Sequence, residues 1–99
     1  MIVEISVVPI GVGESLSSYI TEAVKVLREK GIKYDITPMG TVIEIETFPE
    51  LGELLEDIRK KLESMGVSRI YFSVKVDWRK KATDMEYKVK SVKSKLDIS

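Results

Sequence analysis

Two short segments of the chain combine the residue types of a small-molecule pocket. Residues 8–19 hold a Gly-Val-Gly turn followed by three serines, and residues 38–44 read Pro-Met-Gly-Thr-Val-Ile-Glu. Glycines let a backbone turn sharply or approach a ligand closely, and serine and threonine hydroxyls offer adaptable hydrogen bonds. Each segment lies where a predicted strand meets a tight turn, so we expect the two to meet in space. With the carboxylate of Glu44, they predict a binding pocket rather than a catalytic triad.

The usual catalytic groups of hydrolases are missing from the chain. Its 99 residues include no histidine and no cysteine, which excludes thiolate chemistry and removes the commonest general base and transition-metal ligand. Glu44 and Glu46 share one face of a predicted strand about 7 Å apart, but no nucleophile or positioned water accompanies them, so salt bridges are the favoured role. We therefore predict that the protein is not an enzyme and has no cofactor and no metal site.

The overall charge and the amino terminus exclude two further classes of binding partner, nucleic acids and membranes. Sixteen basic residues balance sixteen acidic ones, so no positive field is available to hold a nucleic-acid backbone. The amino terminus lacks the pattern of a secretion signal, and no apolar run is long enough to span a bilayer. We expect a cytoplasmic protein that binds neither nucleic acid nor membrane. The absence of asparagine and glutamine, with charges mostly from lysine and glutamate, is typical of a thermophile.

Hydrophobic periodicity predicts four strands, at residues 2–8, 33–37, 42–46 and 70–77. A first helix, capped by Ser15 or Ser17, ends at Gly31. A second begins at the capping box of Thr47 and Glu50 and ends near residue 66. A third helix follows Thr83 and Glu86, which also resemble a capping box. The order βαββαβ with an extra C-terminal helix predicts a single domain, residues 1–99, of the α+β class: a ferredoxin-like sandwich with a four-stranded antiparallel sheet in the order 4-1-3-2 and two helices on one face.

The two faces of the predicted sheet differ in composition. The side chains expected to form the core against the two helices are Val3, Ile5, Val7, Tyr34, Ile36, Ile43, Ile45, Phe72, Val74 and Val76. The other face, called the open face below, carries Glu4, Ser6, Val8, Lys33, Asp35, Thr37, Val42, Glu44, Glu46, Tyr71, Ser73, Lys75 and Asp77. An antiparallel sheet commonly leaves one face in water. The mixture of apolar and polar groups equally fits a subunit or ligand surface.

The third predicted helix also bears on whether the open face is exposed to water or forms a contact surface. Its apolar stripe, Met85, Val89, Val92 and Leu96, needs an apolar surface on its own domain or on a neighbouring subunit, because the two main helices already cover the core side. A homo-oligomer is therefore plausible.

Several of these segments together resemble the small thiamine-binding protein family, over nearly the whole chain. The marks are residues 8–11 and 15–20, Tyr34, the Pro-Met-Gly-Thr turn at 38–41 with Ile43 and Glu44, residues 74–79 and residues 90–92. The resemblance implies a ferredoxin-like cytoplasmic subunit, assembled as a dimer of dimers, that binds thiamine or its hydroxymethylpyrimidine portion without catalysis. A pyrimidine amino group can donate to a carboxylate, and the thiazolium cation favours acidic or aromatic surroundings.

The resemblance also implies roles for individual residues. Glu44 would accept a hydrogen bond from the ligand's amino group, while Ser17, Ser18 and Thr41 would supply further hydrogen bonds. Val8, Met39 and Val42 would pack against the rings, with Pro9 and Gly40 completing the site. The alternative hypothesis is a structural or regulatory module that uses the open face to dock a partner protein. An acylphosphatase-like enzyme of the same fold would need an asparagine, and the chain has none.

Overall fold

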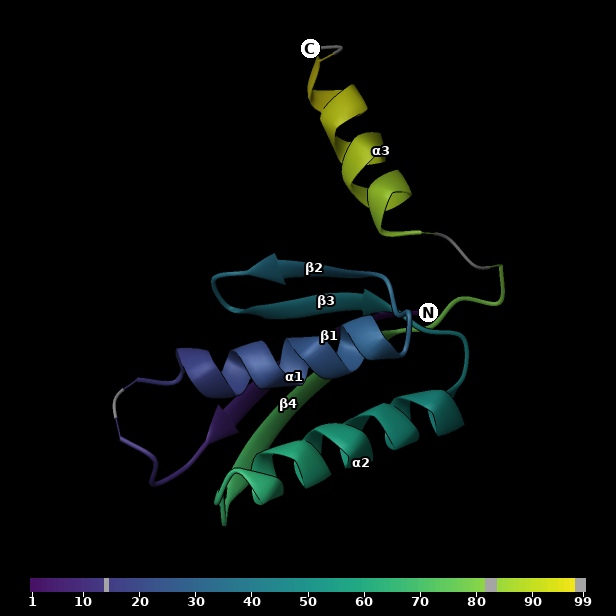
Figure 1. Ribbon diagram of the computed structural model, residues 1–99. Helices are drawn as coiled ribbons and strands as arrows, with labels where there is room; N and C mark the ends of the chain where they lie inside the picture. The colour runs from purple at the N-terminus through teal and green to yellow at the C-terminus, as the bar shows by residue number, and fades with distance from the viewer. Residues whose placement is uncertain (14, 82–83, 98–99) are drawn as a thin grey trace.

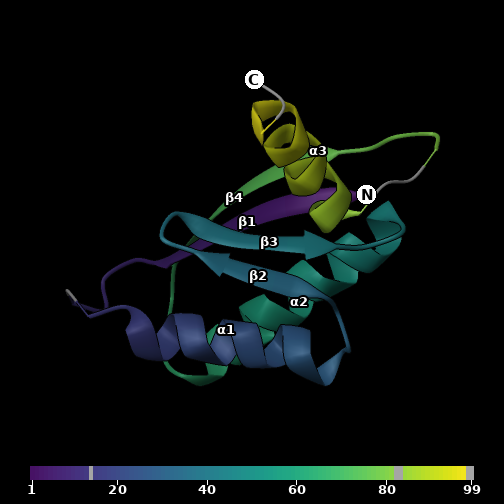
Figure 2. The ribbon, with the colours of Figure 1, turned by 90° about the horizontal axis from the view of Figure 1, so that it is seen from above.

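The chain folds into a four-stranded antiparallel sheet with two helices on one face and a third helix on the other side (Figures 1 and 2). The computed structural model describes residues 1–13, 15–81 and 84–97. The elements follow the predicted order: β1 (Ile2–Pro9), α1 (Ser17–Glu29), β2 (Tyr34–Thr37), β3 (Gly40–Glu44), α2 (Phe48–Ser64), β4 (Ile70–Asp77) and α3 (Met85–Asp97).

The strand order is β2-β3-β1-β4, which is the predicted order 4-1-3-2 in reverse, so the predicted ferredoxin-like fold is confirmed. Strand β1 pairs with β4 along its whole length, from Ile2 opposite Asp77 to Pro9 opposite Ile70. Its pairing with β3 ends at Ile5, opposite Thr41. The second half of β1 therefore has a strand neighbour on one side only, and this asymmetry makes room for the site described below.

The two main helices begin in different ways. Thr47 is the N-cap of α2, and its hydroxyl accepts a hydrogen bond from the Glu50 amide at 3.3 Å, as the predicted capping box requires. The N-cap of α1 is Leu16, without a side-chain capping hydrogen bond, so the prediction that Ser15 or Ser17 caps this helix is wrong. The chain already has helical dihedral angles at Leu16, which places both serines off the capping position.

The core lies between the two central strands and the helix pair. Val3, Ile5, Val7, Ile43 and Ile45 are buried there with the apolar faces of α1 and α2, as predicted. Two core predictions are wrong: Ile36 is 59% exposed and Val76 is 39% exposed. Both lie on the outer strands, β2 and β4, and a layer of two helices covers the central strands better than the outer ones.

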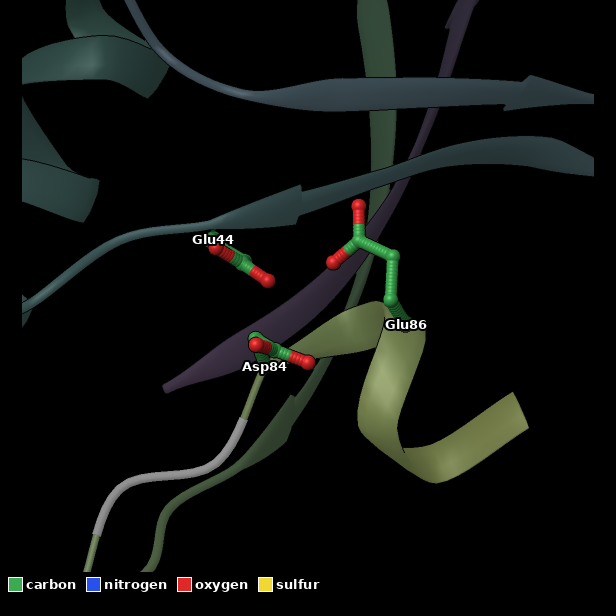
Figure 3. Close-up of side chains that lie close together, drawn as sticks. All are labelled: Glu44, Asp84 and Glu86. Carbon is green, nitrogen blue, oxygen red and sulfur yellow. The ribbon is translucent and has the colours of Figure 1, made fainter. Parts of the chain in front are cut away.

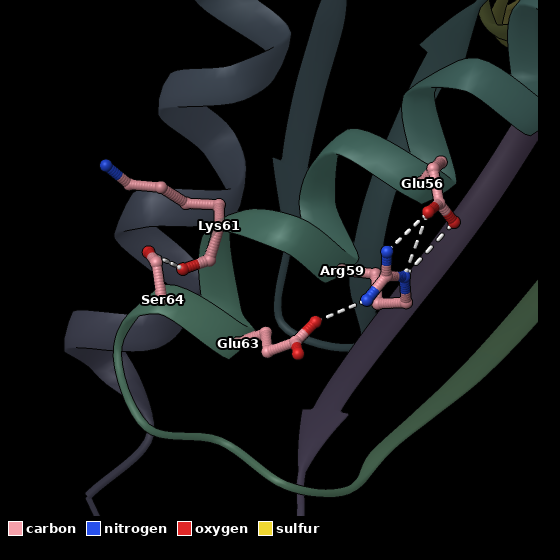
Figure 4. Close-up of polar contacts among 5 residues, drawn as sticks. All are labelled: Glu56, Arg59, Lys61, Glu63 and Ser64. Atoms are coloured by element: carbon pink, nitrogen blue, oxygen red, sulfur yellow. Dashed lines mark hydrogen bonds and ion pairs between the residues drawn. The ribbon is translucent and has the colours of Figure 1, made fainter.

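The solvent side of α2 carries a small network of charges (Figure 4). Arg59 hydrogen-bonds to Glu56 and forms an ion pair with Glu63 one turn later. The hydrogen bond that Arg59 donates to Glu56 raises the pKa of Arg59 above its ordinary value, and Ser64 donates to the Lys61 carbonyl near the helix end. Exposed pairs of this kind stabilise a helix only slightly.

Within residues 1–13, 15–81 and 84–97, no helix is both long and apolar enough to cross a bilayer.

Candidate functional site

A cavity of about 230 Å³ lies between α1 and the turn that joins β2 to β3. Both segments singled out in the sequence reach it: Val8 and Leu16 from the first, and Met39, Gly40 and Thr41 from the second. The expectation that these two segments meet is therefore confirmed. The cavity opens beside the second half of β1, where β3 no longer pairs with it. The full lining is Ile5, Ser6, Val7, Val8, Leu16, Ile20, Ala23, Val24, Leu27, Ile36, Thr37, Pro38, Met39, Gly40, Thr41 and Ile58.

The turn that forms one rim of the cavity is held by a single hydroxyl. Thr37 Oγ1 accepts from the amides of Met39, at 3.3 Å, and Gly40, at 3.2 Å, and donates to the Gly40 carbonyl at 2.9 Å. Gly40 itself lies against β1, because a Cβ built on it would stand 3.0 Å from the Ile5 carbonyl oxygen. Only glycine fits this approach without a shift in β1. The rim is therefore fixed to the sheet.

The lining of the cavity is mainly aliphatic. Its polar members are Ser6, Thr37 and Thr41, and among the residues described it includes no acidic or basic residue. Apolar pockets with a few directed polar groups are typical of small-molecule sites, which usually enclose about 300–1,000 Å³. A smaller cavity without charges suits one neutral ring with small substituents.

The α1 wall of the cavity was not predicted as part of a site. Leu16, Ile20, Ala23, Val24 and Leu27 line it, and their spacing in the sequence reads as a core-facing stripe. Periodicity shows which face of a helix points inward, but not whether the space beneath it is filled. The space stays open because the β2–β3 hairpin stops short of the end of β1. No feature of the sequence predicted this gap.

The other predicted site residues are not part of the lining of this cavity. Ser17 and Ser18 are exposed at the start of α1, Pro9 is buried at the end of β1, and Val42 is half-buried within β3. Glu44 stands at the opposite end of β3 from the turn, about 13 Å from Gly40 at 3.3 Å per residue. Val8, Met39, Gly40 and Thr41 are thus brought together in one chain, whereas the remaining five are not.

Glu44 instead anchors the third helix (Figure 3). Its carboxylate accepts a hydrogen bond from the Met85 amide at 2.6 Å, in the first turn of α3, and lies 3.7 Å from Lys33 Nζ. Asp84 caps the same helix by accepting from the Tyr87 amide at 2.6 Å; the predicted capping residue at position 83 lies outside the described residues. Carboxylates at a helix N-terminus are stabilised by the helix dipole as well as by these hydrogen bonds.

Lysines complete the attachment of α3. Lys33 pairs with Glu86, and this hydrogen bond lowers the pKa of Glu86; Lys88 pairs with Asp77 at the end of β4 and lowers the pKa of that carboxyl. Carboxylate oxygens of Glu44, Asp84 and Glu86 lie within 4.8 Å of one another. The amides of α3 and Lys33 already engage these groups, so we assign the cluster a structural role.

An open groove of about 1230 Å³ runs beside this attachment. Opposite charges are evenly matched along it: Lys30, Lys33, Arg79 and Lys81 against Glu44, Glu46, Glu50 and Asp84. A surface with balanced charges does not concentrate one kind of ion. The apolar cavity is therefore the better candidate site.

These features define a ferredoxin-like α+β domain with a small apolar cavity next to its hairpin turn. The chain belongs to the thiamine-binding protein family, whose sequence profile matches residues 3–93.

Relatives of similar length support this assignment. A UPF0045 protein of Methanothermobacter thermautotrophicus is 37% identical over 95 residues, covering 94% of this chain and 96% of the relative. The UPF0045 protein YqgV of Bacillus subtilis is 33% identical over 101 residues and covers 96% of each chain.

Solved structures share the fold. A hypothetical protein of Methanocaldococcus jannaschii superposes with a TM-score of 0.81 at 29% identity, over 93% of this chain and 94% of that one. A Thermotoga maritima protein, described as a "putative thiamine biosynthesis/salvage protein", gives a TM-score of 0.79 at 26% identity, over 92% and 96% of the two chains.

Proposed function

We propose that this protein binds thiamine or its hydroxymethylpyrimidine portion, without catalysing a reaction, as a homo-oligomer. Membership of the thiamine-binding protein family and the likeness to a structure described as a thiamine biosynthesis or salvage protein support the choice of ligand. The absence of histidine and cysteine from the sequence supports a binding role over catalysis. The observation that carries the proposal is the cavity built by the Pro-Met-Gly-Thr turn against α1.

The cavity suits the pyrimidine portion of the ligand. Its volume, about 230 Å³, accommodates one substituted ring, while the aliphatic walls from α1 and the methionine of the turn contact the faces of that ring. In this proposal the hydroxyl of Thr41 bonds a ring nitrogen or the amino group of the ligand. A thiazolium ring would extend toward the mouth of the cavity, because the lining offers no carboxylate to balance its charge.

The position of Glu44 ties ligand binding to assembly. Within one chain its carboxylate lies at the far end of β3 from the cavity and bonds the start of α3. It reaches a ring in the cavity only if a second copy brings it there. The predicted role of Glu44 therefore depends on an oligomer.

The third helix supports such an oligomer. It stands away from the open face of the sheet (Figure 1), and Val89 and Val92 of its apolar stripe are 54% and 59% exposed. Exposed apolar stripes of this kind mark protein contacts. We propose that α3 packs between subunits of a dimer of dimers, since closed symmetry is the rule for homo-oligomers.

Titration calorimetry with thiamine, with hydroxymethylpyrimidine and with riboflavin as an unrelated vitamin tests the proposal. Thr41→Val removes a cavity hydroxyl and should weaken binding about three- to tenfold, the value of one hydrogen bond. Thr21→Val is the matched control, because the Thr21 hydroxyl bonds the Ser17 carbonyl outside the cavity. Glu44→Gln, measured in the same way, tests separately whether the Glu44 carboxylate contributes to ligand binding. No binding of either ligand by the native protein would overturn the proposal and favour the docking module.

A further inference from the structure

The outer strand β4 presents a long edge of backbone groups. It is eight residues long and, within the part of the chain that the structure describes, pairs with β1 alone. The Ile10 amide donates to the Arg69 carbonyl at 2.8 Å, and this pair continues the β1–β4 register beyond Pro9 opposite Ile70. Hydrogen-bonded pairs alternate along an antiparallel ladder. The odd-numbered residues of β4 thus bond β1, while the N–H and C=O groups of Ile70, Phe72, Val74 and Val76 point outward.

This edge has few of the features that usually protect the edge of a sheet. Natural sheets shield their edges with short strands, prolines, bulges, charges or a covering helix. The other edge strand, β2, fits that description, since it has four residues and is followed by Pro38. Strand β4 contains no proline, and its register with β1 is unbroken over eight residue pairs. Its one charge before the terminal Asp77 is Lys75. Helix α3 is tied to the Asp77 end and stands away from the strand (Figure 1).

The side chains of β4 on the helix side of the sheet are incompletely covered. Ile70, Phe72 and Val74 are half-buried and Val76 is exposed. A groove of about 590 Å³ lies between the end of α2 and this strand, with Ile70 and Phe72 in its lining. An apolar row beside an open backbone edge is the combination that strand addition uses, with backbone bonds for affinity and side chains for specificity.

We propose that β4 pairs antiparallel with β4 of a second copy, about a twofold axis at Ser73, to make one continuous sheet across the dimer. A twofold axis perpendicular to the sheet keeps the helices of both copies on the same side. Antiparallel partners have side chains on one face. Phe72 then lies opposite Val74 of the second copy, and Ile70 lies opposite Val76, so the apolar row of each chain covers that of the other.

Charge complementarity selects this register over its neighbours. Centred on Ser73, the pairing sets Arg69 opposite Asp77 of the second copy, twice by symmetry. Centred on Val74, it would oppose Arg69 with Arg79, and centred on Phe72, it would oppose Arg69 with Lys75. Like charges directly opposite each other destabilise a sheet, whereas opposite charges stabilise it.

This inference rests on the homo-oligomer of the proposed function and names one of its interfaces. The interface is separate from the ligand site, because no residue of β4 lines the cavity. It also differs from the proposed contact through α3, which projects from the open-face side of the sheet (Figure 1). A dimer formed at β4 leaves α3 available to join two dimers.

Cysteine cross-linking tests the register directly, since the native chain has no cysteine. Ser73 is exposed, and in the proposed dimer it faces its own copy in a non-hydrogen-bonded pair with Cα atoms about 4.5 Å apart, close enough for a disulfide. Ser73→Cys should cross-link to a covalent dimer under mild oxidation. Lys75→Cys is the control, because its copies would lie about 13 Å apart along the strands and should stay uncross-linked.

A proline substitution tests the backbone edge itself. The Val74 amide points away from β1, so Val74→Pro removes a bond of the proposed dimer and none of the bonds to β1. Val74→Ala shortens the same side chain but keeps the amide. Light scattering should show half the native mass for Val74→Pro and the native mass for Val74→Ala.

The outcomes separate this interface from the wider proposal. A native chain that is monomeric would overturn both the interface and the proposed assembly. A native oligomer in which Ser73→Cys stays uncross-linked would overturn the interface alone, as would a folded Val74→Pro of native mass. If Val74→Pro fails to fold, the cross-linking result decides.

Discussion

Two glycine-to-alanine substitutions should move stability in opposite directions, because their surroundings differ. At Gly40, the added Cβ would stand 3.0 Å from the Ile5 carbonyl oxygen and 3.5 Å from Glu4 Cγ. The first neighbour is backbone of the central strand, so it cannot rotate aside. At Gly52, within α2, nothing lies within 4 Å of an added Cβ. The same chemical change is therefore strained at the cavity rim and unhindered on the helix.

The magnitudes follow from these contacts. Overpacking against fixed atoms costs about 1–3 kcal/mol, and the lower entropy of the unfolded alanine chain returns about 0.4–1 kcal/mol. Gly40→Ala should thus lower the free energy of unfolding by roughly 1–2 kcal/mol. Gly52→Ala should raise it by about 0.5–1 kcal/mol, because glycine is a poor helix former. At about 4–8 °C per kcal/mol for a domain of this size, the melting temperatures of the two variants should differ by at least about 6 °C.

Thermal and urea unfolding followed by circular dichroism, at one protein concentration, measures both variants against the native chain. Equal concentration matters because the proposed assembly would make the melting temperature depend on it. If Gly40→Ala is as stable as the native protein while Gly52→Ala behaves as expected, the turn does not press on β1 as described. Calorimetry on the same variant then shows whether ligand binding needs this contact.

Three further predictions concern the scaffold. Thr47→Ala should cost about 0.5–2 kcal/mol in urea unfolding through loss of the α2 cap, and Thr47→Ser should retain most of that stability. Leu54→Ala, at a fully buried position, should cost about 2–5 kcal/mol, whereas Arg59→Ala should leave the unfolding midpoint unchanged within error, since its ion pairs are exposed. Lysine hydrogen bonds lower the pKa of Asp77 and Glu86, so their stabilisation is complete above the ordinary carboxyl pKa of about 4 and is lost as the pH falls below it. Amide chemical shifts of α3 should then change at acid pH before those of the sheet, and an α3 that responds no earlier than the sheet would contradict this attachment.

The sequence was sufficient for the order of elements and most of the core, because both follow from local periodicity and capping. The strand pattern of residues 70–77 and the capping box at Thr47 are both confirmed. The exposed positions of Ile36 and Val76 were not predictable in this way. Alternation assigns a side chain to a face, but how far two helices extend over that face depends on how they pack together.

The candidate site was also predictable from the sequence only in part. That the two segments meet follows from the fold, because the turn at 38–40 and the end of β1 occupy the same end of the sheet. The attachment of Glu44 to Met85 joins residues 41 positions apart, and no pattern in the sequence indicates it. The α1 wall of the cavity could not be predicted, since a stripe of aliphatic residues has the same spacing above a filled space as above an empty one.

Unequal strand lengths explain both the cavity and the proposed interface. Strands β1 and β4 have eight residues each, whereas β3 has five and β2 has four. On one side of β1 the pairing with the hairpin stops at Ile5, and the cavity lies beside the rest of the strand, between α1 and the turn. On the other side β4 follows β1 to its end and offers a full-length outer edge. A longer hairpin would fill the cavity with a continuing β3, and a shorter β4 would lose the proposed pairing. The candidate ligand site and the proposed subunit contact therefore lie on opposite sides of the same central strand, so substitutions can alter one without altering the other.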